Sequence, residues 1–451
     1  MANRPALGAR AASWTGLVLF GWWWAWRRLR HTYLFYDEWA MVDRVVHSAP
    51  LDGMTTGFNT HLWFLQDPIY RLQGLWFGFD DHWLVVALFL VALAGFQLVL
   101  AALFERAGMA VLPAALTATL LVYLGTASQN FTFAIQVSPT VAAAAAFTPG
   151  LLVIDRRASR MRDVGVGLAV LLATLADSGF GVVGLVFAAV LISRVWSWRH
   201  LVSLVPAALV LVWWFGLTDQ GPAPFPSSAG HQVVFAARLL IRSAGALVGG
   251  GAVVGVAVLV VFVAAAAAAL RWGTMPPGGR ALAIGALVAT VVVAVGISHN
   301  RAGIPGLAWR DFNRYLQNVG VPLVLAAAPG LVAVGSRLVG TAPARRRWGA
   351  AVACAAIAAA FALSVPAERD YAADFLAWNG LVRQRVEATA VVLATGCPEG
   401  TVLHLDAQPA GGFSPQVTAQ LVLDLMGRGL LHVQPGVAPD PALTAELCTA
   451  P

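Results

Sequence analysis

The sequence contains no lysine, so all 29 of its basic residues are arginine. Charged residues make up only 11% of the 451 positions, and hydrophobic residues make up 59%. About 25% of the residues in a soluble globular domain are charged, so this composition excludes that class. The absence of lysine, together with the abundance of alanine, glycine and valine, is typical of a GC-rich bacterial genome.

Cysteine is also scarce, with three residues in the chain. Cys354 lies inside an apolar run, where it is expected to be an inert packing residue. Cys397 and Cys448 lie in a polar tail, where they form one disulfide if the tail is outside the cytoplasm and remain two thiols if it is inside. No ligand spacing demands a metal, and no glycine-rich phosphate loop precedes a basic helix start.

Long apolar runs dominate what remains, and each is long enough to cross a bilayer as a helix. No small-residue cleavage site follows the first run, so we interpret it as a retained span. The sequence therefore predicts an all-α polytopic membrane protein with about eleven spans, at 12–30, 83–104, 108–125, 138–154, 164–177, 179–193, 201–217, 248–270, 281–298, 316–336 and 348–365.

The linkers between these spans alternate between short, arginine-rich segments and longer segments that contain most of the acids. The positive-inside rule then predicts a plasma-membrane protein with a cytoplasmic N-terminus and, after an odd number of spans, an extracytoplasmic tail. The arginines separate apolar runs and do not form a basic face, so nucleic acid is not an expected partner. "RRLR" at 27–30 lies on the predicted outer side, against the rule, and we interpret these arginines as reaching towards phosphates at the membrane surface.

Two outer segments have recognisable patterns of their own. In the first outer loop, "EWAMVDRVV" and "QDPIYRLQGLW" predict two helices lying in the membrane interface, with Asp67 as the N-cap of the second and Ile69, Leu72 and Trp76 as its apolar stripe. The tail contains a helix, a strand "TVLHLD" and a helix "SPQVTAQLVLDLMGRG". We predict a transmembrane domain at 1–365 and a small α/β extracytoplasmic domain at 366–451.

Polar clusters recur on the predicted outer side of the membrane. They supply carboxylates suited to proton transfer, amides suited to sugar hydroxyls and arginines suited to phosphate. The resulting candidates are Asp37, Glu38, Asn59, His61, Arg71, Gln136, Asp177, Arg301, Arg314 and Tyr315. This set is an active-site inventory at a membrane surface.

The order of these motifs resembles the C-type glycosyltransferase superfamily, in particular its actinobacterial branches. The resemblance covers most of residues 14–340 and is carried by "YDEW", "FNTHLWFLQDPIYRL", "NFTFAIQ", "DSGFG" and "RYLQNVGVPLVL". It implies transfer of a sugar from a polyprenyl-phosphate donor to a glycan, lipid or protein acceptor of the cell envelope. A metal bridges carboxylate and phosphate in some relatives of this superfamily.

The resemblance also implies roles for individual residues. Asp37 corresponds to the catalytic carboxylate, and Glu38 shares that role or binds the acceptor. Arg314, followed by Arg301, is the expected partner of the donor phosphate. The remaining candidates are expected to bind substrate.

Some of these residues also have simpler interpretations that involve no catalysis. Asp37 and Glu38 can lie in water beyond a helix end, His61 can be merely solvated, and Asp177 can either line a cavity or cap a helix. A transporter or a lipid or sugar flippase is an alternative function, which requires charges near mid-membrane and often an inverted repeat. A non-catalytic scaffold is another, and it should lack a cavity joining Asp37 to Arg314.

Overall fold

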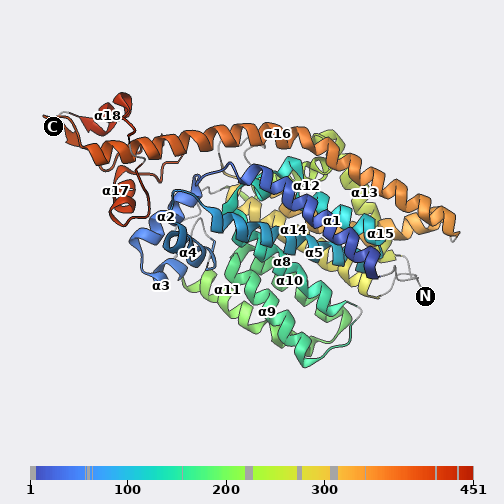
Figure 1. Cartoon of the computed structure of the whole chain (residues 1–451). Helices are drawn as coiled ribbons and strands as arrows, with labels where there is room; N and C mark the ends of the chain where they lie inside the picture. The colour runs from blue at the N-terminus through green and yellow to red at the C-terminus, as the bar shows by residue number, and fades with distance from the viewer. Residues whose placement is uncertain are drawn as a thin grey trace.

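The computed structural model describes residues 7–55, 57, 61–62, 64–154, 156–218, 227–271, 277–304, 313–340, 342–411, 414–433 and 436–449. Long helices form a bundle (Figure 1). Its members are α1 (Leu7–Leu29), α5 (Trp83–Arg106), α6 (Val111–Val122), α8 (Val137–Val153), α9 (Arg160–Ala176), α10 (Ser178–Val195), η3 (Trp198–Leu204) with α11 (Val205–Leu217), α12 (Ala229–Ala246), α13 (Ala252–Arg271), α14 (Pro277–Arg301), α15 (Arg314–Val339) and the first half of α16 (Pro343–Thr395). The short helices η1 (Gly125–Ala127), α7 (Gln129–Thr132) and η2 (Ala134–Gln136) connect α6 to α8.

A helix occupies every one of the eleven predicted spans. Within the described residues, eight helices are long and apolar enough to cross a membrane by length and composition. The other three predicted spans correspond to α1, which contains several arginines and tryptophans, and to the shorter helices α6 and α9. The chain is therefore a multi-pass membrane protein, while the number of eleven crossings stays a prediction.

Glycines allow the helices of the bundle to approach closely. A Cβ atom on Gly330 of α15 would lie 1.8 Å from the backbone oxygen of Ala265 in α13. A Cβ atom on Gly255 of α13 would lie 2.0 Å from the backbone oxygen of Ile241 in α12. Close approach of backbones is how helices associate in lipid, where burying apolar side chains gives little advantage.

The first outer loop folds into three helices, where the sequence predicted two. They are α2 (Asp37–His47), α3 (Pro50–Thr55) and α4 (Gln66–Phe77). Trp39, Val42 and Val46, which share one face of α2, are buried. The N-cap prediction for Asp67 was wrong, because α4 begins one residue earlier, at Gln66, and the residue before it makes no side-chain cap.

Helix α4 buries mainly polar residues and exposes mainly apolar ones. Its buried residues include Asp67, Tyr70 and Gln73, whereas Leu72, Leu75 and Trp76 are exposed. A stripe facing a protein core would be buried, so Leu72, Leu75 and Trp76 point away from the bundle, whereas Ile69 packs partly buried against its core. This arrangement suits a helix whose apolar face lies in lipid while its polar face contacts the protein.

Helix α16 continues without a break across the predicted domain boundary at 365/366. It has 53 residues, which at about 1.5 Å per residue corresponds to about 80 Å. Figure 1 shows it passing along the whole bundle and ending beside α17 (Ala419–Gly427) and α18 (Pro441–Leu447), at the end where α2 and α4 lie. The division into domains at 365/366 stays a prediction, and helix α16 continues through that position without interruption.

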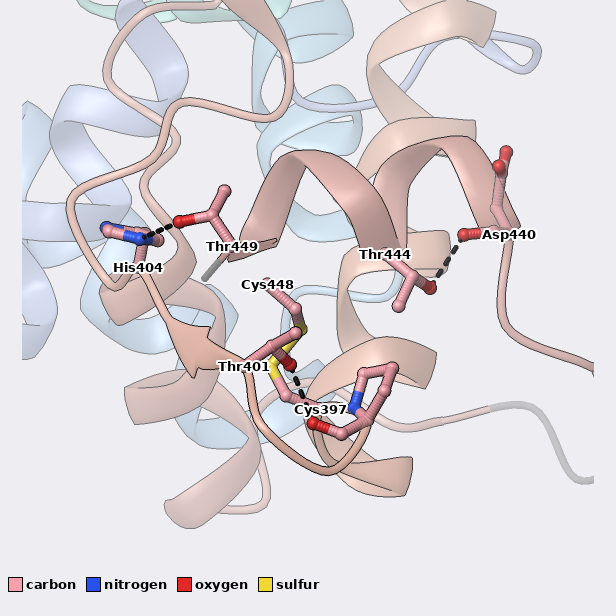
Figure 2. The surroundings of a disulfide bond; sticks show 8 residues. Cys397, Thr401, His404, Asp440, Thr444, Cys448 and Thr449 are labelled. Carbon is pink, nitrogen blue, oxygen red and sulfur yellow. Dashed lines mark hydrogen bonds between the residues drawn. A yellow bond between two sulfur atoms is a disulfide. The ribbon is translucent and has the colours of Figure 1, made fainter. Parts of the chain in front are cut away.

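The segment after α16, residues 396–449, contains little sheet. The predicted strand "TVLHLD" is reduced to β1 (Val402–Leu403), which pairs antiparallel with β2 (Cys448–Thr449). Cys397 and Cys448 form a disulfide beside this pair, where His404 and Thr449 also share a hydrogen bond (Figure 2). The sequence left this pairing open, and the side of the membrane on which the tail lies stays a prediction.

Candidate active site

A cavity of about 300 Å³ lies where α2, α10, α14 and α15 converge. One part of its wall is apolar and includes Val183, Phe215, Val293 and Ile297. The polar part contains seven of the ten predicted site residues, namely Asp37, His61, Gln136, Asp177, Arg301, Arg314 and Tyr315. These residues are separated by up to 278 positions in the sequence, and the helical bundle gathers them at one place.

Asp37 is the first residue of α2, and its side chain is only 7% exposed. Burial raises the pKa of its carboxyl above the ordinary value of 3.8, while the nearby guanidinium groups of Arg314 and Arg301 act in the opposite direction. The bland interpretation, in which Asp37 lies in water beyond a helix end, is therefore wrong. A carboxylate of raised pKa in a cavity is suited to accept a proton.

The backbone immediately before Asp37 is strained. Among the described residues other than glycine, Tyr36 alone has a positive φ, with φ 47° and ψ −108°. Such conformations cost on the order of 1–3 kcal/mol and persist only where surrounding contacts enforce them. The conformation of Tyr36 sets the direction in which α2 begins, and with it the position of Asp37.

Arg314 and Tyr315 are the first two residues of α15. The Arg314 guanidinium donates to the Tyr315 hydroxyl at 3.1 Å and lies 5.0 Å from the centre of that ring. The backbone carbonyl of Arg314 accepts a hydrogen bond of 2.5 Å from the side-chain amide of Asn130. Arg301, at the end of α14, is the second arginine of the cavity wall.

Asp177 has both of the roles that its position in "LADSGFG" suggested. One carboxylate oxygen accepts from the Phe180 amide at 3.0 Å and caps the start of α10. The other lies 3.3 Å from Nδ1 of His61. Ser178 accepts a hydrogen bond of 3.2 Å from the amide of Leu62, so this turn also holds the segment that carries His61.

Glu38 does not line the cavity. It is 1% exposed, accepts a 2.7 Å hydrogen bond from the Tyr70 hydroxyl, and lies 3.4 Å from Nδ1 of His82. Burial, and then the Glu38 charge, raises the pKa of Tyr70 well above 10. The Glu38 carboxylate joins α2 to α4 outside the cavity, and the role in proton transfer or acceptor binding that the sequence suggested for Glu38 stays a prediction.

Arg71 is a second predicted site residue that lies outside the cavity. Its guanidinium donates to Asp67 at 2.6 Å and to the carbonyl of Ser48 at 2.9 Å, which ties the C-terminal end of α2 to α4. Asn59 lies outside the described residues. Within the described chain, no group of three His, Cys, Asp or Glu side chains is placed to hold a metal ion.

Asn300 and Asn318 line the cavity but were missing from the predicted set. Asn318 lies four residues after Arg314, and residues at that spacing share one face of a helix. The helical period of α15 was thus a signal that could have identified Asn318. A smaller cavity of about 20 Å³ shares Gln136, Phe180 and Asn318 with the first and adds the amides of Asn130 and Gln317.

A third cavity, of about 590 Å³, is larger but has a different character. It lies between α6, α13, α15 and α16, and its described lining is almost entirely aliphatic. Arg346 is the one ionisable group among those lining residues. Chemistry on a polar substrate therefore belongs to the cavity that contains Asp37.

The fold and the cavity together define a multi-pass helical membrane protein with a polar site at one end of its bundle. Its fold is similar to that of ArnT from Cupriavidus metallidurans bound to undecaprenyl phosphate, with a TM-score of 0.52 and 15% identity over 97% of this chain and 91% of that one. The apo state of ArnT gives a TM-score of 0.51 at 15% identity, over 93% and 85% of the two chains. No protein-family model and no curated protein matches the sequence.

At 15% identity this likeness concerns the fold alone. It agrees at that level with the superfamily that the sequence motifs resemble. The actinobacterial branch, by contrast, stays a prediction from the sequence.

Proposed function

We propose that the protein is an extracytoplasmic glycosyltransferase, which moves a sugar from a polyprenyl-phosphate carrier to a glycan, lipid or protein acceptor of the cell envelope. The observation that carries this proposal is the gathering of Asp37, Arg301 and Arg314 in one cavity. The fold shared with a structure that holds undecaprenyl phosphate supports the choice of carrier.

Asp37 is the proposed general base. An acceptor hydroxyl attacks the anomeric carbon of the sugar, its proton passes to the Asp37 carboxylate, and the bond between that carbon and the phosphate oxygen breaks. The raised pKa of Asp37 favours this step, because a carboxylate that binds a proton more tightly is a stronger base.

Arg314 and Arg301 are the proposed partners of the phosphate. The leaving phosphate gains negative charge as the bond breaks, so permanently charged groups beside it stabilise the transition state. A guanidinium group is suited to this because its planar donors match phosphate oxygens. The Tyr315 hydroxyl, at 3.1 Å from Arg314, supports the position of that group.

The remaining cavity residues have chemistry that suits the rest of a polyprenyl-phosphate sugar. Gln136, Asn300 and Asn318 offer both donors and acceptors to sugar hydroxyls. Val293, Ile297 and Phe215 offer an apolar wall to the first isoprene units. The pair of His61 and Asp177 faces the same space and is a further candidate for binding hydroxyl groups.

Transfer of label from a polyprenyl-phosphate sugar tests this function. The protein in nanodiscs is incubated with a panel of labelled polyprenyl-phosphate sugars and with membranes that supply acceptors. Asp37→Asn should reduce transfer by at least about 100-fold, since a positioned base contributes on the order of 10²–10⁴. Asp43→Asn, a change of the same kind on the exposed side of α2, should leave transfer unchanged.

Binding of polyprenyl phosphate alone, measured by native mass spectrometry, tests the role of the arginines. Arg314→Ala should weaken binding by at least tenfold, whereas Arg337→Ala at the opposite end of α15 should not. Normal transfer by Asp37→Asn, or equal binding by both arginine variants, contradicts the proposed mechanism.

A further inference from the structure

The elements after residue 366 hold the segment that precedes Asp37. The Asn379 side chain in α16 is 1% exposed and bonds both backbone groups of Tyr33, donating to its carbonyl at 2.7 Å and accepting from its amide. Two residues further on, the rings of Phe35 and Phe375 pack edge to face with their centres 5.2 Å apart. Helix α16 therefore fixes the chain just before α2 by both polar and apolar contacts.

The strained residue Tyr36 has its own partner in the same part of the chain. Its backbone amide donates a 2.9 Å hydrogen bond to the hydroxyl of Ser414, and Ser414 is completely buried. Tyr36 occupies the N-cap position of α2, and the next residue is Asp37. A buried bond at this amide compensates for a backbone conformation that is otherwise unfavourable.

The other end of α2 is held from the same side. Nε2 of His47, the last residue of α2, lies 2.8 Å from a carboxylate oxygen of Asp424 in α17. Both ends of the helix that carries Asp37 thus contact elements that lie after residue 366. The bundle itself contributes Phe133, which packs on Phe375 and Phe35.

We propose that Ser414 and Asn379 are positioning residues, which hold residues 33–36 in the conformation that directs the Asp37 carboxylate into the cavity. The segment after α16 then contributes to the reaction by positioning Asp37, without contacting the substrate. This inference rests on the proposed function for its catalytic consequence, but the positioning itself is measurable in the protein without substrate.

Hydrogen–deuterium exchange of the full-length protein in nanodiscs measures the positioning directly. In Ser414→Ala the amides of residues 33–40 should exchange at least tenfold faster than in the unchanged protein. Ser414→Thr keeps the hydroxyl and should restore protection. The control is Thr444→Ala, which removes an exposed hydroxyl from α18 in the same segment and should change nothing at residues 33–40.

The transfer assay measures the consequence for catalysis. We expect Ser414→Ala and Asn379→Leu to lower kcat by about tenfold with little change in KM for the donor, and Ser414→Thr to recover most of the loss. Displacing Asp37 also changes its electrostatic interactions with its charged neighbours, which are Arg314, Arg301, Glu38 and His61. The acid limb of the pH profile should therefore move.

Unchanged exchange at residues 33–40 in Ser414→Ala overturns the inference. So does faster exchange spread evenly over the whole chain, because that result describes a general loss of stability. If the unchanged protein transfers no sugar, the proposed function fails, whereas the exchange experiment still decides whether Ser414 fixes this segment.

Discussion

Glu368 of α16 and Arg28 at the end of α1 form a salt bridge of 2.7 Å, in which the Glu368 side chain is completely buried. Arg27 approaches the same carboxylate at 3.4 Å. This pairing explains "RRLR", which contradicted the positive-inside rule in the sequence. The interpretation that Arg27 and Arg28 reach towards phosphates at the membrane surface is corrected, because both guanidinium groups pair with the buried carboxylate of Glu368.

Removing Glu368 should therefore destabilise the protein. Breaking a buried ion pair by removing one partner costs about 3 kcal/mol or more, since the remaining charge stays without compensation. We expect Glu368→Ala to lower the Tm of the detergent-solubilised protein clearly. In Glu446→Ala, which breaks an exposed bridge to Arg385, the loss should stay below about 1 kcal/mol. Equal losses in the two variants contradict the structural importance of Glu368.

The pH dependence of transfer should report the environment of Asp37. The base accepts a proton only when it is ionised, so activity rises with pH through its pKa, which burial holds above 3.8. The Arg314 charge lowers that pKa, so Arg314→Ala should move the acid limb of kcat/KM to higher pH. Arg337→Ala should not move it. A limb that stays in place or moves to lower pH in Arg314→Ala shows that another group titrates.

The bridge between His47 and Asp424 should make the contact of α2 with α17 sensitive to pH. The hydrogen bond to Asp424 raises the pKa of His47 above 6.5, so its stabilisation is full below pH 6.5 and is lost as pH rises through the folded value. His47 in turn lowers the pKa of Asp424 below 3.8, so that contribution is lost only in strong acid. The protection factors of the amides in α17, which are corrected for the intrinsic pH dependence of exchange, should therefore be lower at pH 8.5 than at pH 6, and His47→Gln should abolish that difference.

Reduction of the disulfide should loosen the segment after α16. Cys397 and Cys448 are separated by 51 residues. Closing a loop of that length lowers the conformational entropy of the unfolded chain, which stabilises the folded state by about 4 kcal/mol. We expect a reductant to make residues 396–449 sensitive to limited proteolysis, and Cys397→Ser with Cys448→Ser to have the same effect. Cys354→Ala, which removes the free cysteine, should leave the digestion pattern unchanged.

Labelling of the reduced cysteines in intact cells tests the predicted sidedness of the tail. A thiol reagent that does not cross membranes should modify Cys397 and Cys448 only after reduction, because the tail is expected outside the cytoplasm. Modification that requires permeabilised cells would place the tail inside and reverse the predicted topology.

Most helices of the bundle could be predicted from the sequence because each apolar run is long enough to define a span by itself, whereas α12 lies outside the eleven predicted spans. Much of the cavity could also be predicted, because polar clusters on one side of a membrane have only one surface on which to meet. The faces of α4 could not, since periodicity shows that Leu72 and Trp76 share a stripe but not whether lipid or protein covers it. The positions of Glu38 and Arg71 outside the cavity could not be predicted for a related reason: their partners Tyr70 and Ser48 are recognisable only in three dimensions.

The continuous helix α16 connects the membrane bundle to the segment that precedes the proposed catalytic carboxylate of Asp37. This helix of about 80 Å runs from Pro343 through Pro366 to Thr395, so a change of tilt of its first half in a thicker or thinner membrane also moves the half that contains Asn379. Asn379 belongs to that helix, while Asp37 is the first residue of α2, a helix that the sequence predicts to lie in the membrane interface. Lipids of different chain length should thus tune turnover without touching the substrate.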